Sequence, residues 1–238
     1  MTETIVTLEL NPLNRDEVLR YLGYRGQEVT SEIDALLDAL MERCLEIARP
    51  RAALRTFAVA DARRREDGLP ELVLEGAALS LVGHDIATHL ADARAVGVMA
   101  VTLGTALEQE LRRLALTDTT SALILDAAST TAVEQAADAA ESLLVAEARN
   151  RGLFPTWRYS PGYGDFPLAA QPTLLATLDA QRRLGVTLTD SLLMIPTKSV
   201  TAVVGMLAHP RDGVRPGCAT CALRPHCSVR TTGRTCHG

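Results

Sequence analysis

The sequence predicts an α+β fold in which an antiparallel sheet is flanked by helices, because stretches with helical and strand character follow one another along the chain. The strongest helical signal is residues 119–150, which are dominated by Ala, Leu and Glu. The strand signals are short runs such as residues 71–75, separated by turns that contain Gly or clustered charges. Towards the end the composition changes to Arg, Gly, Pro and Cys, so we expect a main domain over residues 1–213 and a small cysteine-rich tail over residues 214–238.

Length and composition are those of an ordinary globular protein. The chain has 238 residues, enough for one domain with a full core, and 47% of them are hydrophobic while 22% are charged. The net charge of −5 argues against a general affinity for nucleic acid or for anionic membranes. No apolar run approaches the roughly 20 residues of a membrane span, and the first residues lack a basic signal-peptide region, so we expect a cytoplasmic protein.

Two helices are expected before the first central strand. Residues 14–23 begin with a good N-cap and end at a glycine. Residues 31–48 carry apolar side chains at spacings of three and four, which predicts one buried face. Ser31 and Asp34 suggest a capping box at the start of this helix. Cys44 belongs to the apolar face, so we interpret it as a core thiol.

From residue 54 onward, strand and helix signals alternate. In order, we expect strands over 54–60, 71–75 and 78–82, a helix over 84–94, a strand over 96–103 and a helix over 107–114. The arginine run at residues 63–65 indicates a solvated turn between the first two strands. His84 and His89 lie five residues apart and do not share a helix face, so we assign them no metal.

The alanine-rich helix over residues 119–150, with one interruption expected near Ser129, leads directly into an aromatic loop. Most of its acidic side chains should be solvated, with one or two facing a ligand; they are Asp126, Glu134, Asp138 and Glu141. Beyond the loop we expect a helix over 174–184. A strand, a proline turn and a second strand through 203–207 should then form a hairpin that closes the sheet.

The aromatic loop, residues 156–167, concentrates side chains that are rare elsewhere in the chain. It holds the one tryptophan, two of the four tyrosines and one of the three phenylalanines of a protein that is 3% aromatic. Arg158 can grip a carboxylate with two parallel hydrogen bonds, and Tyr159 and Tyr163 offer π faces to an organic cation. S-adenosylmethionine combines a carboxylate, a cation and a stackable base. The alternative is a structural corner packed on the core.

The pattern Arg158-x-x-x-Gly162-Tyr163 resembles the S-adenosylmethionine loop of the reactivation domain of cobalamin-dependent methionine synthase. Two later stretches are similar to motifs that follow this loop in that family, and in the same order. Gly185–Thr189 resembles its Gly-hydrophobic-x-Leu-Thr stretch, and Met194–Val200 resembles its Met-x-Pro-x-x-Ser-Val turn. The alanine-rich helix before the loop agrees in character.

This resemblance implies the fold of that domain and a binding site for S-adenosylmethionine. Arg158 would hold the methionyl carboxylate, Gly162 would let the backbone close on the ligand, and Tyr163 would pack near the sulfonium with Tyr159 beside it. The implied function is that of a stand-alone reactivation protein, which supports reductive remethylation of cob(II)alamin on a partner. The partner would be a corrinoid-bearing methionine synthase or a related methyltransferase, with flavodoxin or ferredoxin as the electron donor.

Two features depart from the family pattern. The family follows Gly-Tyr with Pro-Ala, whereas this chain has Gly164-Asp165. The cobalamin-binding signature Asp-x-His-x-x-Gly is absent from the sequence, so we expect the corrinoid to be held by another chain.

The tail contains four of the five cysteines of the chain, at positions Cys218, Cys221, Cys227 and Cys236. Thiolates at this spacing, in a protein without an export signal, favour a metal over disulfides, and zinc and an iron–sulfur cluster are both compatible with them. His226 and His237 are further candidate ligands, and a redox-active tail without metal is the alternative. The corrinoid setting favours [4Fe–4S], because returning cob(II)alamin to use needs one electron; structural zinc is the rival.

Two other functions are compatible with the sequence. One is a non-catalytic, metal-stabilised module that docks corrinoid proteins without binding S-adenosylmethionine. The other is a methyltransferase acting on a small molecule. The second is disfavoured, because no Gly-x-Gly-x-x-Gly follows a predicted strand as a Rossmann domain would require.

Overall fold

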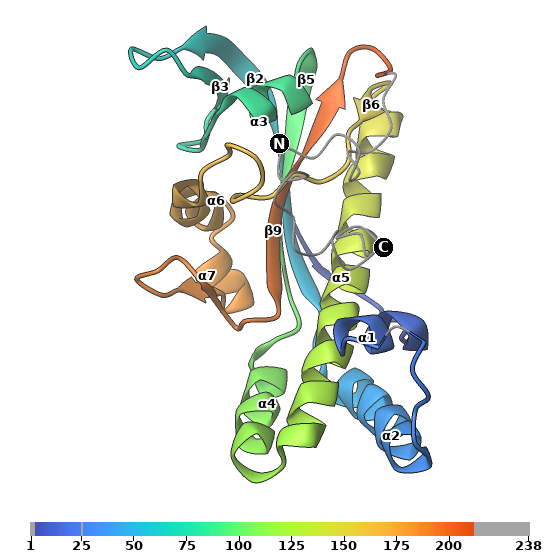
Figure 1. Ribbon diagram of the computed structural model, residues 1–238. Coiled ribbons are helices and arrows are strands. Elements are labelled where there is room, and N and C mark those ends of the chain that lie inside the picture. The colour runs from blue at the N-terminus through green and yellow to red at the C-terminus, as the bar shows by residue number, and fades with distance from the viewer. Residues whose placement is uncertain (1–2, 25, 212–238) are drawn as a thin grey trace.

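The computed structural model describes residues 3–24 and 26–211, and it confirms the α+β fold with helices on both faces of an antiparallel sheet (Figure 1). Within these residues a seven-stranded sheet has the order β4-β3-β2-β5-β9-β6, and β1 also pairs with β2. Its strands are β1 (Glu3–Thr7), β2 (Arg51–Arg64), β3 (Pro70–Leu74), β4 (Ser80–Val82), β5 (Ala93–Thr102), β6 (Phe154–Pro155) and β9 (Ser199–Leu207). A separate small sheet pairs β7 (Thr187–Leu188) with β8 (Met194–Ile195).

The helices surround this sheet. They are α1 (Arg15–Tyr21), α2 (Ser31–Ile47), α3 (His84–His89), α4 (Thr105–Thr117), α5 (Thr119–Asn150), α6 (Gln171–Thr177) and α7 (Ala180–Leu184), with a 3-10 turn η1 (Leu168–Ala170) before α6. In Figure 1, α5 runs along the length of the sheet on one side, and α6 and α7 lie on the other. None of the described helices is long and apolar enough to cross a membrane.

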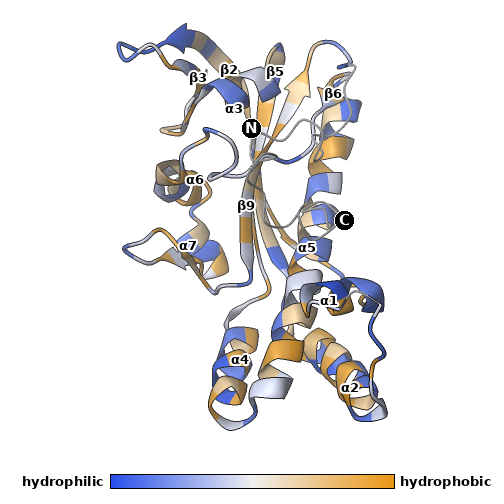
Figure 2. Ribbon diagram, viewed as in Figure 1, coloured by the Kyte–Doolittle hydropathy of each residue, from blue (hydrophilic) through white to orange (hydrophobic). Residues whose placement is uncertain are grey.

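Successive side chains of the central strands point to opposite faces of the sheet, and apolar side chains on each face form a core there. In β5, Met99 and Val101 pack with α1, α2, α4 and α5, whereas Val98 and Ala100 pack with α3, α6 and α7. Both sets are fully buried, so β5 is covered on both faces. Figure 2 shows the hydrophobic colour of β5 in the middle of the sheet and the hydrophilic colour of the β2–β3 turn at its far end.

The strand β2 is longer than the sequence predicts. Its first half lies between β1 and β5, and its second half pairs with β3. The predicted turn at residues 63–65 is therefore partly wrong, because Arg63 and Arg64 still belong to the ladder opposite Glu71 and Pro70. The Arg63 Nε donates to Glu71 Oε2 at 2.8 Å, so a cross-strand ion pair holds this exposed arginine in extended backbone.

The helix α5 is continuous over 32 residues, so the interruption expected near Ser129 is wrong. The hydroxyls of Ser129 and Thr131 donate to the carbonyl oxygens of Leu125 and Ala127 one turn earlier, and the helix accommodates both. The predicted core thiol is confirmed. Cys44 is fully buried against Ser129, and burial raises the pKa of its thiol to about 11.

Two helix boundaries differ from the predictions, because a capping hydrogen bond and a change of backbone conformation set them. The cap of α2 is Thr30, whose hydroxyl accepts from Ile33 N–H, so the capping box predicted from Ser31 is wrong by one residue. The helix expected over 84–94 ends at His89, and Asp92 follows with a positive φ of 63°.

The helix expected over 174–184 is divided in two by Asp179, which has a φ of 48°. The predicted hairpin is only partly correct. Residues 187–195 form their own small sheet, whereas β9 inserts between β5 and β6. The strand β1 was not predicted. The proposed domain boundary after residue 213 lies outside the described residues.

Candidate functional site

The candidate site begins with an extended stretch, residues 154–159, which we call the edge segment because it runs along the outer edge of β9. Phe154 and Pro155 pair with the end of β9, and further along Tyr159 N–H donates to the carbonyl of Val203 at 2.8 Å. Between them, Thr156 Oγ1 accepts from Gly205 N–H at 2.8 Å. Because side chains alternate along extended backbone, Trp157 and Tyr159 lie on one face of the segment and Arg158 lies on the other.

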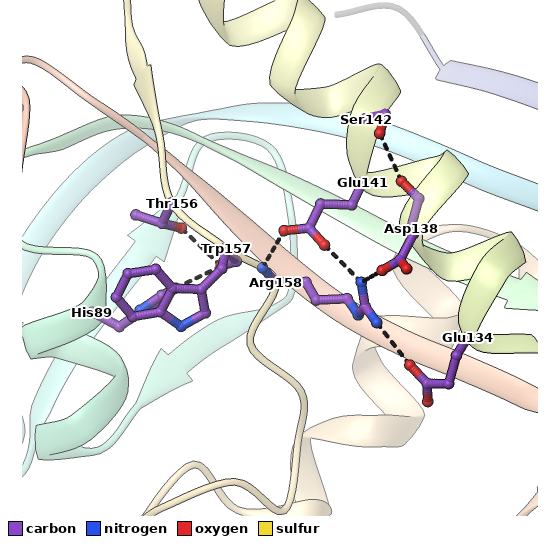
Figure 3. A network of polar contacts seen from close by, with 8 residues as sticks. All are labelled: His89, Glu134, Asp138, Glu141, Ser142, Thr156, Trp157 and Arg158. Carbon is purple, nitrogen blue, oxygen red and sulfur yellow. Dashed lines mark hydrogen bonds and ion pairs between the residues drawn. The ribbon is translucent and has the colours of Figure 1, made fainter. Parts of the chain in front are cut away.

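On the α5 face, Arg158 meets three carboxylates (Figure 3). Its Nη2 is 2.7 Å from Glu134 Oε2, its Nη1 is 2.7 Å from Glu141 Oε2, and Nη1 also pairs with Asp138. The other Glu141 oxygen accepts from the backbone N–H of Arg158 at 2.9 Å, which fixes the segment to the helix. The three acids share one helix face because they are spaced by four and three residues.

The charges of this cluster do not balance. One guanidinium faces three carboxylates, and the Arg158 side chain is 15% exposed. Burial alone would lower the pKa of Arg158, but its hydrogen bonds and charge interactions with Asp138, Glu141 and Glu134 raise that pKa above its usual value. Glu141 is 14% exposed, whereas Glu134 and Asp138 are 45% and 66% exposed. The cluster is therefore a negatively charged surface with one largely buried and two exposed carboxylates.

On the opposite face, His89 of α3 packs between two aromatic rings of the edge segment. Its ring centroid lies 4.9 Å from that of Trp157 and 4.8 Å from that of Tyr159. Since a carbonyl only accepts, Nε2–H of His89 donates to the Trp157 oxygen at 2.9 Å. The side chain is 5% exposed, and burial lowers its pKa to about 4. His89 is thus neutral, and it holds α3 against the edge segment.

The edge segment continues into a compact turn, residues 160–166, which we call the glycine loop. The Phe166 carbonyl accepts from Gly162 N–H at 2.8 Å, and Gly162 has a φ of 92° that favours glycine. Phe166 is buried beneath the loop, whereas Tyr163 is 54% exposed with its ring centroid 5.9 Å from that of Tyr159. Burial, followed by the charges of Asp85 and Asp165, raises the pKa of Tyr159 to about 12.

The structure brings together only part of the predicted site. Tyr159, Gly162 and Tyr163 lie on one continuous loop, but Tyr159 packs on His89 whereas Arg158 points towards α5. That one or two acids of α5 face a ligand stays a prediction; the structure places three of them around Arg158. Asp126 lies nearer the start of α5 and pairs with Lys198.

Sequence reasoning missed two contributions to the site. The role of Glu141 in binding both the backbone and the guanidinium of Arg158 could have been suspected from its helical spacing. The contact of His89 with the edge segment has no local signal. Within residues 3–24 and 26–211, no group of His, Cys, Asp or Glu side chains forms a metal site. Cys218, Cys221, Cys227 and Cys236 lie outside the described residues.

The buried neutral His89 predicts a loss of stability in acid. Its folded-state pKa of about 4 lies below the unfolded value of 6.5, so the unfolded state binds the proton first. Its contribution is retained above pH 6.5 and is lost as the pH falls towards 4. Between pH 7 and pH 5 we expect this group to lower the free energy of unfolding by about 2 kcal/mol.

Urea unfolding at the two pH values measures this difference. His89→Gln, which keeps an N–H donor, should reduce the pH dependence by that amount, whereas His84→Gln at an exposed position should not. An equal pH dependence in wild type and His89→Gln would contradict the assignment.

Comparison with known proteins identifies the family and a solved structure of the same fold. The family model described as "Vitamin B12 dependent methionine synthase, activation domain" matches residues 82–212, more than half of the chain. A solved structure titled "Crystal Structure of the MetH Reactivation Domain bound to AdoHcy" is similar with a TM-score of 0.64 and 17% sequence identity. That match covers 90% of this chain and 81% of the other, which shows a shared fold. No curated protein matches.

The region matched by the family model contains every element that builds the site: α3, α5, the edge segment, the glycine loop and β9. The predicted resemblance is therefore confirmed, and the chain belongs to the activation-domain family of vitamin B12-dependent methionine synthase.

Proposed function

We propose that this chain binds S-adenosylmethionine at the edge segment and glycine loop, and that it donates the methyl group in the reactivation of a corrinoid protein. The observation that carries the proposal is Arg158, the first residue of the Arg158-x-x-x-Gly162-Tyr163 pattern, which lies among three carboxylates just before the loop of the exposed Tyr163. The solved relative of the same fold is titled as bound to AdoHcy, the product that S-adenosylmethionine leaves after methyl transfer.

The charge of the cluster suits this ligand. S-adenosylmethionine carries a carboxylate, an ammonium and a sulfonium, and is therefore a net cation. Arg158 would receive the carboxylate through its fork of N–H donors. Glu134 and Asp138 are exposed, and ion pairs at exposed positions contribute little, so the ligand carboxylate can displace them from the guanidinium. The displaced carboxylates remain beside the bound ligand and can face its positive groups.

The glycine loop would complete the site. Gly162 has no side chain on its outer surface, where an added Cβ would meet only Leu168 Cδ1, at 3.9 Å. The backbone is therefore accessible to a ligand. Tyr163 is the exposed aromatic side chain of the loop, and its ring face can attract a sulfonium. Tyr159 packs against Tyr163 and holds it from behind.

The reaction needs positioning more than acid–base groups. One electron converts cob(II)alamin on the partner to cob(I)alamin, whose cobalt is a strong nucleophile. The partner's cobalt would then attack the methyl carbon of S-adenosylmethionine: the cobalt–carbon bond would form, the sulfonium S–CH₃ bond would break, and S-adenosylhomocysteine would leave with the bonding pair. No proton moves, so the residues of this chain act by orienting the methyl group towards the partner.

We further propose that Cys218, Cys221, Cys227 and Cys236 hold a [4Fe–4S] cluster, with zinc as the alternative metal. Four cysteine thiolates are a sufficient ligand set for either. A cluster would supply the single electron that cob(II)alamin requires. Arg211, the last described residue, donates to the backbone carbonyls of Thr88 and His89, so the chain leaves the domain next to the edge segment.

Binding of S-adenosylmethionine is the first test. Titration calorimetry should detect S-adenosylmethionine and S-adenosylhomocysteine, and Arg158→Ala should weaken both by about 1.5–3 kcal/mol, because a charge-assisted bidentate contact is lost. Arg158→Lys, which keeps a charge near the three acids, should also bind more weakly than wild type.

Arg151→Ala is the matched control, since Arg151 pairs with Glu147 in an exposed position and should leave the affinity unchanged. If wild type with millimolar S-adenosylmethionine gives no heat in calorimetry and no shift in melting temperature, the proposal is wrong.

Reactivation itself is the second test. A methionine synthase that lacks its own reactivation domain is loaded with cob(II)alamin and mixed with this chain, S-adenosylmethionine and a reductant. We expect methylcobalamin to form, and to form more slowly with Arg158→Ala. If the partner is remethylated equally fast without the chain, the assigned role is wrong. Binding to the partner without any effect on rate would instead support a non-catalytic docking module.

Metal analysis tests the tail. Anaerobically purified protein should be brown and contain about four irons per chain. Cys218→Ser or Cys221→Ser should abolish the colour and leave S-adenosylmethionine affinity unchanged. Cys44→Ala should leave the iron content unchanged, because Cys44 is buried in the main core. One zinc without sulfide would make the tail structural, and the absence of both metals would favour a redox-active tail.

A further inference from the structure

The short helix α3 receives its N-terminal cap from a distant part of the chain. Its own N-cap residue is Gly83, which has no side chain to accept a hydrogen bond. The carboxylate of Asp165 accepts instead: Oδ1 accepts from Asp85 N–H at 2.8 Å, and Oδ2 accepts from His84 N–H. Asp165 thus satisfies two donors at the start of α3 from a position 80 residues beyond Asp85.

The exchange between the two segments is reciprocal. Asp85 Oδ2 accepts from the backbone N–H of Asp165 at 3.1 Å, so each aspartate bonds to the backbone of the other. A capping box uses the same arrangement within one helix, but here it joins two separate segments.

Because the two segments approach so closely, the two positions that precede these aspartates have no room for a side chain and carry glycine. A Cβ on Gly83 would lie 2.5 Å from Asp165 Oδ1, and a Cβ on Gly164 would lie 2.3 Å from Asp85 Oδ2 and 2.5 Å from the Tyr159 hydroxyl. Gly83 and Gly164 have φ values of 138° and 51°, in the region that favours glycine. The pairs Gly83/Asp85 and Gly164/Asp165 therefore form one complementary contact.

This contact fixes the far end of the glycine loop. The near end is held by Tyr159, which pairs with Val203 of β9. Gly162 and Tyr163 lie between these two fixed points, and Tyr163 is exposed. The two anchors therefore fix both ends of the stretch that carries Gly162 and Tyr163, and they set where this stretch lies relative to β9 and α3.

We propose that Asp165, together with Asp85, is a positioning residue for the ligand loop: it places Gly162 and Tyr163 for S-adenosylmethionine without contacting the ligand. The inference rests on the proposed binding of S-adenosylmethionine. It assigns a purpose to the Gly164-Asp165 pair, which the sequence presents only as a departure from the family pattern.

The principal test is the S-adenosylmethionine dependence of the remethylation rate. Asp165→Ala should raise the KM for S-adenosylmethionine by roughly tenfold, because two hydrogen bonds to a charged acceptor are lost, and should leave kcat nearly unchanged at saturating ligand. Asp165→Asn keeps one acceptor oxygen and should recover part of the affinity. Asp190→Ala, at an exposed loop aspartate, is the matched control and should behave as wild type.

A fall in kcat with an unchanged KM, or an unchanged KM in both Asp165 variants, would overturn the inference. Should Asp165→Ala fail to fold, Asp165→Asn carries the same comparison.

A second measurement needs no ligand. Trp157 is the one tryptophan of the chain and packs on His89 of α3, so its fluorescence reports the contact between α3 and the edge segment. Acrylamide should quench Trp157 more strongly in Asp165→Ala than in wild type or Asp190→Ala. If wild type binds no S-adenosylmethionine, the proposed function fails, but the quenching experiment still tests whether Asp165 holds the loop. Equal quenching in all three proteins would show that Asp165 does not hold it.

Discussion

The pairing of the edge segment with β9 is the interaction on which the candidate site depends. The two hydrogen bonds between Tyr159 and Val203, with the contacts of Thr156 to Gly205, keep this segment extended. Extended backbone sends alternate side chains to opposite faces, so the aromatic rings and the arginine of a single motif are separated. Without this pairing, neighbouring residues would not reach α3 on one side and α5 on the other.

The helix α5 serves both the core and the site. Its alanine-rich face packs on the sheet so closely that a Cβ on Gly97 of β5 would lie 2.8 Å from Leu144 Cδ2. The acidic side chains of α5 serve the site instead: Glu134, Asp138 and Glu141 contact the guanidinium of Arg158. Because α5 is held by an extensive core, three carboxylates can be kept together with one cation, although their charges repel.

The helix α3 braces the site from the other face. It contains only six residues and would be unstable alone, yet core packing and three further contacts hold it. Asp165 caps its start, the His89 ring packs on the edge segment, and Arg211 donates to the carbonyls at its end. The point where the chain leaves the described domain and the loop proposed to bind the ligand are therefore joined through one short helix.

Much of the fold and the family could be predicted from the sequence, because they depend on local patterns. Apolar periodicity predicted α2, helix-favouring composition predicted α5 and strand character over residues 96–103 predicted β5, all in approximately correct positions. The Arg158–Tyr163 motif indicated the family that the comparison then showed. Boundaries were less accurate, as with Arg63 and Arg64, where a cross-strand partner extends β2.

The sequence by itself determined which residues are available for the site, and the tertiary structure decided how they are arranged. Sheet order, the opposed directions of Arg158 and Tyr159, and the exchange between Asp85 and Asp165 all join residues far apart in the chain. Local propensity carries no information on such contacts, because a hydrogen bond between distant segments depends on how the sheet brings them together.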